Sequence, residues 1–365
     1  MKPFIFIFIL ILFLTSCVHP GKLSKLPSSV NLKSSDFNIS LSETSNKILA
    51  AQYLGCGGIY FQQEGTGVIL DPFFSNQKMG KLFGSVFSNK RKIKSDSLMI
   101  NFGLNAIEKE TGKLDGQVQA IFSAHSHYDH LMDVPAIFQR FQKKPTVFLS
   151  KSGYVICKNV IDTTYMVTLD NHVSTQNCAL DPIVLSTKNG KKINVYPILS
   201  EHNPHKNNIK FFSGTVTRTP TYFKNAYDKT RSNDWLEGSI YSFLIDYLDE
   251  NGAIELRLFI QSSSCNPPNG FPPVTLLQKK KIDIAFLGVA SYSASPDYPK
   301  ELLKIISPQK IVWVHWEDFF QAYNKKTKAV RGTDEVAFFE KVMPTSGYVH
   351  EWFTPFPRVK IEIKY

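Results

Sequence analysis

Three histidines and an aspartate fall within six consecutive residues of this chain, in the run HSHYDH at positions 125–130. The whole sequence holds only nine histidines in 365 residues, so this cluster constrains the fold more than any other segment. It follows an apolar run, residues 117–123, which predicts a buried strand. Alternate residues point to the same side only where the backbone is extended. A strand that ends and turns inside the motif therefore directs His125 and His127 to one point, and Asp129 and His130 to a neighbouring one.

Neutral imidazoles and carboxylates are ligands for zinc, and they also suit manganese and iron. The motif therefore predicts a site for one or two metal ions, with zinc as the first candidate. The alternative is a polar loop whose histidines lie on the surface.

The motif and its surroundings resemble the metallo-β-lactamase-fold hydrolases, in the subtype whose ligand motif has the form HxHxDH. Residues 55–60 and 65–72 are similar to the family's opening hairpin. Downstream, the apolar runs 193–198 and 310–314 each lead to a histidine, His202 and His315. The resemblance covers residues 48–363 and implies a four-layer αββα sandwich, with two mixed β-sheets flanked by helices. The order of expected elements agrees with a mixed α/β fold of two sheets, because early strands form hairpins and later ones alternate with helices.

The same resemblance implies the role of each candidate site residue. His125, His127 and His202 are the expected ligands of a first metal ion, and Asp129, His130 and His315 those of a second. A metal-bound hydroxide would attack a carbonyl or phosphoryl centre, and Asp129 would also be the catalytic residue that orients the water. Asp71 matches a family aspartate that supports the motif loop, and His205 is expected on the substrate side or behind the ligands.

One position departs from the family pattern. The family usually has an aspartate that bridges both metals after the strand that follows the Asn-Gly hairpin, and this chain has Ser262-Ser263-Ser264-Cys265 there. Ser262 and Cys265 are possible substitute ligands, although a neutral serine is a poor bridge. A mononuclear hydrolase, an unusual dinuclear one and a non-catalytic protein of the same fold all remain open.

The N-terminus predicts export and a lipid anchor. Residues 1–16 form a short basic start and an apolar run, and they resemble a bacterial lipoprotein signal peptide with Cys17 as the lipidated residue. An ordinary signal peptide or an uncleaved anchor are the alternatives. Residues 17–46 are rich in Ser, Lys and Asn and predict a flexible tether, followed by a hydrolase domain over 47–365. Because Val18 is not acidic, we expect the periplasmic side of the outer membrane in a diderm host.

The net charge of +11 indicates a basic surface, with clusters at 78–94, 279–281 and 325–326. These clusters favour a membrane surface or an anionic substrate, unless they are simply solvated loops. An exported protein is not expected to bind nucleic acid. The long connection 72–97, rich in Phe and Lys, predicts a lid or a membrane-facing flap, with simple surface variation as the alternative. Four cysteines besides Cys17 permit three disulfide pairings or free thiols.

These observations predict a metal-dependent hydrolase of the bacterial cell envelope that cleaves an ester or phosphodiester. Its substrate is expected to be a small molecule, amphiphilic or derived from lipid. The alternative is a non-catalytic metal-binding or scaffold lipoprotein.

Overall fold

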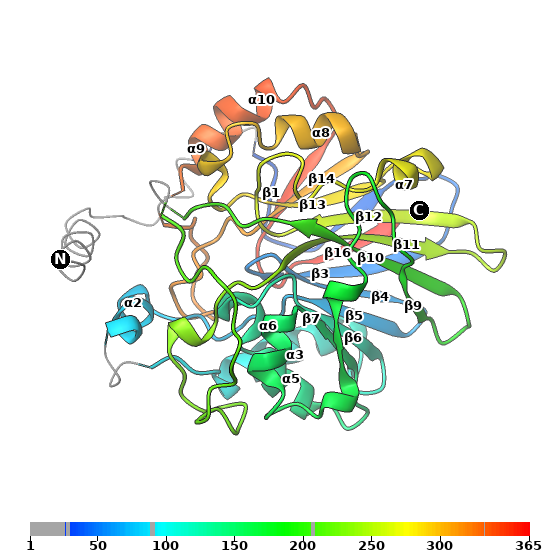
Figure 1. Cartoon of the computed structure of the whole chain (residues 1–365). Helices are drawn as coiled ribbons and strands as arrows, with labels where there is room; N and C mark the ends of the chain where they lie inside the picture. Colours follow the sequence, from blue (N-terminus) through cyan, green and yellow to red (C-terminus); the bar gives the residue numbers. More distant parts are fainter. Residues whose placement is uncertain (1–25, 27–29, 88–91, 206–208, 332) are drawn as a thin grey trace.

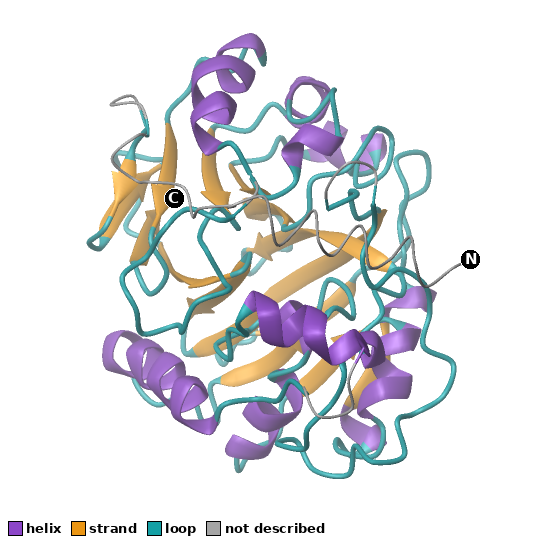
Figure 2. Ribbon diagram, turned by 90° about the vertical axis from the view of Figure 1, so that its left-hand side faces the viewer, coloured by secondary structure: helices purple, strands orange, loops and turns teal. Residues whose placement is uncertain are grey.

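Two eight-stranded β-sheets pack face to face, and helices cover their outer faces (Figure 1). The structure is a computed structural model that describes residues 26, 30–87, 92–205, 209–331 and 333–365. Figure 2 shows the same layers after a quarter turn, with helices on either side of the strands. This four-layer sandwich of two mixed sheets confirms the predicted fold class.

The first sheet has the order β1-β15-β14-β13-β12-β11-β10-β9. Its strands from β9 to β12 are antiparallel neighbours, and those from β12 to β15 are parallel. The hairpin predicted at Asn251-Gly252 joins β11 and β12, and Gly252 has φ +85° there. The strands are β1 (Leu32–Lys33), β9 (Ile183–Ser186), β10 (Lys192–Ser200), β11 (Ile240–Leu248), β12 (Ile254–Gln261), β13 (Ile284–Gly288), β14 (Lys310–Val314) and β15 (Trp352–Pro355).

The second sheet has the order β2-β16-β3-β4-β5-β6-β7-β8. It is antiparallel from β16 to β5 and parallel from β5 to β8. The motif strand β6 therefore lies inside the parallel half, where both faces are covered. The strands are β2 (Phe37–Ser40), β3 (Ile48–Gly55), β4 (Gly58–Gln63), β5 (Thr66–Leu70), β6 (Val118–Phe122), β7 (Thr146–Leu149), β8 (Met166–Thr168) and β16 (Lys360–Lys364).

An apolar core fills the space between the sheets, and two further clusters lie beneath the helices. Rings from opposite sheets meet in the central cluster: Phe61 and Phe286 have centroids 5.4 Å apart.

The helices are α2 (Met79–Phe87), α3 (Ser97–Thr111), α4 (Tyr128–Leu131), α5 (Val134–Arg140), α6 (Lys151–Cys157), α7 (Val274–Lys279), α8 (Lys300–Ile306), α9 (Glu335–Ala337) and α10 (Met343–Thr345), with a π-helical turn at Phe338–Val342. None of the helices in the described part of the chain is long and apolar enough to cross a bilayer.

The predicted tether over 17–46 was wrong for its second half. Leu32 pairs with Thr354 in a parallel β1–β15 contact, and Phe37 pairs with Ile361 between β2 and β16. These strands are only two and four residues long and gain their partners from the C-terminal end of the chain, so their local sequence is too short to predict them. The signal peptide 1–16 and Cys17 lie outside the described residues.

The described parts of the connection, residues 72–87 and 92–97, contain buried residues and a helix that the sequence did not predict. Phe73 and Phe74 are buried in the core, and α2 occupies the middle of the segment. The following helix α3 was not predicted, although Asp96 caps it by accepting from the N–H groups of Leu98 and Met99.

Candidate metal centre

The HSHYDH motif spans the junction between β6 and α4. The backbone of His127 is extended, with φ −62° and ψ 153°, and the first turn of α4 begins at the next residue. His125 and His127 therefore leave an extended segment, whereas Asp129 and His130 leave a helical turn. All four side chains are buried, with at most 7 % of any residue exposed. The local geometry is the one that the sequence predicted.

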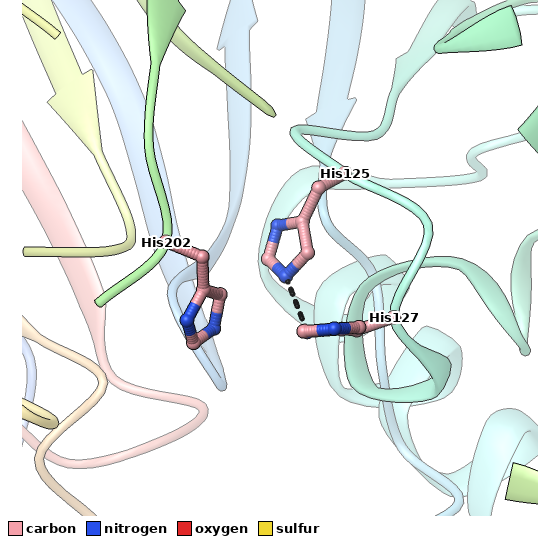
Figure 3. A group of neighbouring side chains, drawn as sticks. All are labelled: His125, His127 and His202. Atoms are coloured by element: carbon pink, nitrogen blue, oxygen red, sulfur yellow. Dashed lines mark hydrogen bonds between the residues drawn. The ribbon is translucent and has the colours of Figure 1, made fainter. Parts of the chain in front are cut away.

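His125, His127 and His202 form a first triad whose imidazoles face one another (Figure 3). One nitrogen from each ring lies within 4.8 Å of the others. The Nε2 of His125 and the Nδ1 of His127 are 3.0 Å apart. Two lone pairs so close repel each other unless a proton or a cation lies between them. His202 comes from the loop after β10 and completes the group from the other sheet.

Backbone carbonyls fix the tautomers of two of these rings. The Nε2 of His127 lies 3.3 Å from the carbonyl of Phe212, and the Nδ1 of His202 lies 2.7 Å from that of Asn203. A neutral imidazole that donates from one nitrogen keeps a lone pair on the other, which is how proteins orient metal-ligating histidines. Burial, reinforced by the neighbouring histidines, holds the pKa of His125, His127 and His202 well below the usual range. All three rings are therefore neutral at pH 7 and suited to a divalent cation.

Asp129, His130 and His315 form a second triad beside the first. Asp129 Oδ2 lies 3.9 Å from the Nε2 atoms of both His130 and His315. The His125 and His130 rings have centroids 4.0 Å apart, so the two triads are adjacent. Burial raises the pKa of Asp129, and burial together with His130 lowers that of His315 to about 3.

Asp71 supports the motif from behind. Its Oδ1 accepts the N–H of Ala124 at 2.6 Å, and its Oδ2 lies 3.1 Å from the Nδ1 of His130. Burial by itself would lower the pKa of His130, but the carboxylates of Asp71 and Asp129 outweigh it and raise that pKa. A carboxylate on the outer nitrogen of an imidazole directs the inner nitrogen toward a metal. Asp71 is thus where the resemblance placed it, behind the motif loop.

A second support was missed in the sequence. His315 has φ +54°, and its N–H donates to the hydroxyl of Tyr53 at 2.7 Å. That hydroxyl donates in turn to the carboxylate of Glu317 at 2.5 Å, and Glu317 also accepts the N–H of Cys56. Tyr53 belongs to β3 and His315 follows β14, so the contact joins the two sheets. No local signal marks Tyr53, because its partners lie more than 260 positions away in sequence.

His205 lies next to the first triad without belonging to it. Its ring stacks on that of His202, with centroids 4.6 Å apart, and its Nδ1 accepts the N–H of Phe211 at 3.1 Å. A neutral His205 therefore carries its proton on Nε2. Burial, with the nearby charge of Lys210, lowers its pKa to about 4. His205 lines the same cavity as His127 and His202, and its role on the substrate side or behind the ligands stays a prediction.

The two candidate substitute ligands after β12, Ser262 and Cys265, lie in different places relative to the triads. Ser262 lines the cavity and donates to Asp71 Oδ2 at 3.2 Å. It is tightly enclosed, since a Cβ added to Gly288 would lie 2.1 Å from its carbonyl oxygen. Cys265 is not brought to either triad, because its thiol donates to the carbonyl of Asn269 at 2.9 Å. Within the described residues it is one of four free thiols, with Cys56, Cys157 and Cys178.

The chain matches no protein-family model and no curated protein. Among solved structures it is similar to a metallo hydrolase from the archaeon Ignicoccus hospitalis, at 12 % identity and a TM-score of 0.46, over 87 % of this chain and 100 % of that one. It is similar to a putative zinc-dependent hydrolase of the metallo-β-lactamase superfamily from Thermotoga maritima, at 10 % identity and a TM-score of 0.32, over 84 % and 98 %. It is also similar to CmlA, a diiron β-hydroxylase from Streptomyces venezuelae, at 12 % identity and a TM-score of 0.43, over 89 % of this chain and 55 % of that one.

Proposed function

We propose that this protein is a metal-dependent hydrolase that cleaves an ester or phosphodiester. One observation carries the proposal: two adjacent triads, together five imidazoles and one carboxylate, lie beside one cavity, which is lined by His127, Asp129, His202 and His315. The donor set suits zinc, and it also suits manganese or iron. A bound divalent ion supplies Lewis acidity, which activates water and polarises the oxygen of the substrate.

The residues of the chain would divide the remaining work. His125, His127 and His202 hold one ion, and Asp129, His130 and His315 hold the other. The free oxygen of Asp129 orients the attacking water and accepts its proton. His205, whose Nε2 carries a proton, donates a hydrogen bond to the substrate oxygen on which negative charge develops.

The first experiment measures metal per chain by elemental analysis of a soluble form that begins near residue 26, beside His127→Ala. We expect about two ions per chain in the parent and a loss in the variant, because His127 belongs to the first triad. His172→Ala, outside both triads, is the matched control and should keep the parental metal content. A parent that binds no metal from zinc-, manganese- or iron-replete buffer would refute the proposal. Hydrolysis of 4-nitrophenyl acetate and bis(4-nitrophenyl) phosphate then separates esters from phosphodiesters.

A non-catalytic metal-binding scaffold is the second candidate. Ser262 favours it, because a neutral hydroxyl stands where the resembling family has a bridging carboxylate, and it is already engaged with Asp71. A protein that binds metal tightly and hydrolyses neither probe would support this candidate.

We further propose that the protein is anchored to the bacterial cell envelope through a lipid on Cys17. The support is the sequence of residues 1–17, which resembles a lipoprotein signal. Fractionation of cells that express the full chain or Cys17→Ser tests it. We expect the parent with the membranes and the variant in the soluble fraction; the same fraction for both would refute the anchor.

A further inference from the structure

The cavity above the two triads has a polar floor and aromatic walls. It measures about 80 Å³, and its polar lining includes four of the candidate ligands, His127, Asp129, His202 and His315, together with the serine segment 262–264. Its apolar lining consists of Leu82, Phe83, Phe211, Phe212, Phe319 and Phe320. Pockets of this kind bind the apolar part of a ligand through their walls and orient it through a few polar groups.

One aromatic wall adjoins the first triad. Phe83 of α2 packs against Phe211 and Phe212, with ring centroids 5.1 and 6.2 Å apart. Phe212 also lies 6.3 Å from the ring of His127, and its carbonyl is the acceptor near that ring. The same residue therefore contributes to the wall and orients a candidate ligand.

Hydrogen bonds attach this wall to a neighbouring segment of the fold. The helix α2, which carries Leu82 and Phe83, is held by Ser232: its N–H donates to Ser85 Oγ at 3.0 Å, and its hydroxyl donates to the carbonyl of Leu82 at 2.6 Å. A ligand that docks against a preformed wall spends little free energy on ordering it.

A second aromatic wall adjoins the other triad. Phe319 lies 5.1 Å from the ring of His315, and Phe320 packs on Phe319 with centroids 4.5 Å apart. Each triad therefore has an aromatic side chain beside it that can contact an apolar group next to the reacting bond of a substrate.

We infer that the substrate carries a compact apolar group, an aromatic ring or a short branched alkyl, directly beside its hydrolysable bond. This inference rests on the proposed function. A closed cavity that holds benzene measures about 150 Å³, and the volume here is 80 Å³. A ring is thus held partly between the walls, whereas a long acyl chain would extend into water and gain little from its far end. The inference narrows the lipid-derived substrates that the sequence suggested to those with a compact group at the reacting bond.

The test compares phosphonates on the zinc-loaded protein by isothermal titration calorimetry. Methylphosphonate, phenylphosphonate and octylphosphonate offer the same anionic head and differ only in the apolar group. We expect phenylphosphonate to bind about 10–100-fold more tightly than methylphosphonate, because burial of one ring face contributes this much. Octylphosphonate should bind no more tightly than phenylphosphonate.

A wall variant and a matched control locate the effect. Phe83→Ala should remove most of the difference in affinity between phenylphosphonate and methylphosphonate. Phe102→Ala, which truncates a 41 % exposed ring on α3, should keep the preference. Equal affinity for the methyl and phenyl compounds, or an unchanged preference in Phe83→Ala, overturns the inference, as does tighter binding of the octyl compound. A protein that binds zinc but none of the phosphonates also overturns it, whereas a protein that binds no metal refutes the proposed function itself.

Discussion

The hydroxyl of Tyr53 lies between two groups on which the second triad depends, so Tyr53→Phe tests how His315 is positioned. The hydroxyl accepts from the backbone of His315 at 2.7 Å and donates to Glu317 at 2.5 Å. Tyr53 is 1 % exposed, and phenylalanine fills nearly the same volume. The change therefore removes two buried hydrogen bonds and almost no packing.

The expected loss of stability follows from the two buried polar groups that lose their hydrogen-bond partner, the N–H of His315 and the carboxylate of Glu317. Each buried polar group that loses its partner costs about 1–3 kcal/mol, so the free energy of unfolding should fall by at least about 2 kcal/mol. His315 has φ +54°, a conformation that costs a non-glycine residue about 1–2 kcal/mol and persists only where contacts hold it. We expect the affinity of the second metal site to fall about 10–100-fold, as is usual when the support of a ligand is removed. The first site, which does not include His315, should keep its affinity.

The measurement is a calorimetric titration of metal-free protein with zinc, with a competing chelator to resolve the two affinities. Urea unfolding of the metal-free protein gives the stability separately. Tyr323→Phe is the matched control, because that hydroxyl is buried near the same turn and has no hydrogen-bond partner among the described residues. It should change neither zinc affinity. Two parental affinities in Tyr53→Phe, together with lower stability, would show that Tyr53 only ties the sheets together and would refute the positioning role.

Three further outcomes follow from buried charges. Asp71→Asn should weaken zinc binding at the second metal site about 10–100-fold, and parental zinc affinity in this variant would contradict the supporting role of Asp71. Asp133→Asn is the control and should keep the parental zinc affinity, because the buried carboxylate of Asp133 accepts two backbone N–H groups and supports no candidate ligand. Arg257→Met should lower the free energy of unfolding, measured in urea, by about 3–5 kcal/mol. The reason is that Asp246, which is 0 % exposed and bound by Arg257 at 2.6 and 2.7 Å, would keep a buried charge without a partner. Adding Asp246→Leu should recover much of the lost stability, and no recovery would argue against an unpaired charge as the cause. Burial raises the pKa of Glu335 from 4.5 to about 8, so the folded state holds this proton more tightly and stability falls as the pH rises between those values. Glu335→Gln should flatten this part of the pH–stability curve, and an unchanged slope would show that Glu335 does not cause it.

Local sequence determined the motif and its immediate geometry. The apolar run before His125 predicts β6, and the change from extended to helical backbone at Tyr128 separates the four side chains into two directions. The same holds for the hairpin at Asn251-Gly252, where the turn residues carry the information. These features depend on neighbours a few positions apart, and backbone sterics and side-chain period act at that range.

The assignment of His202 and His315 relied on the family resemblance, and the structure brings both to the motif from loops of the other sheet. Local pattern could not have given the strands β1 and β2, which pair with the C-terminal part of the chain. Nor could it have given Tyr53 as the contact that holds His315, or the aromatic walls that bound the cavity. Each depends on segments far apart in sequence that meet only after the two sheets pack. A sequence pattern records the period of one element, whereas such contacts are fixed by the packing of several elements around a shared core.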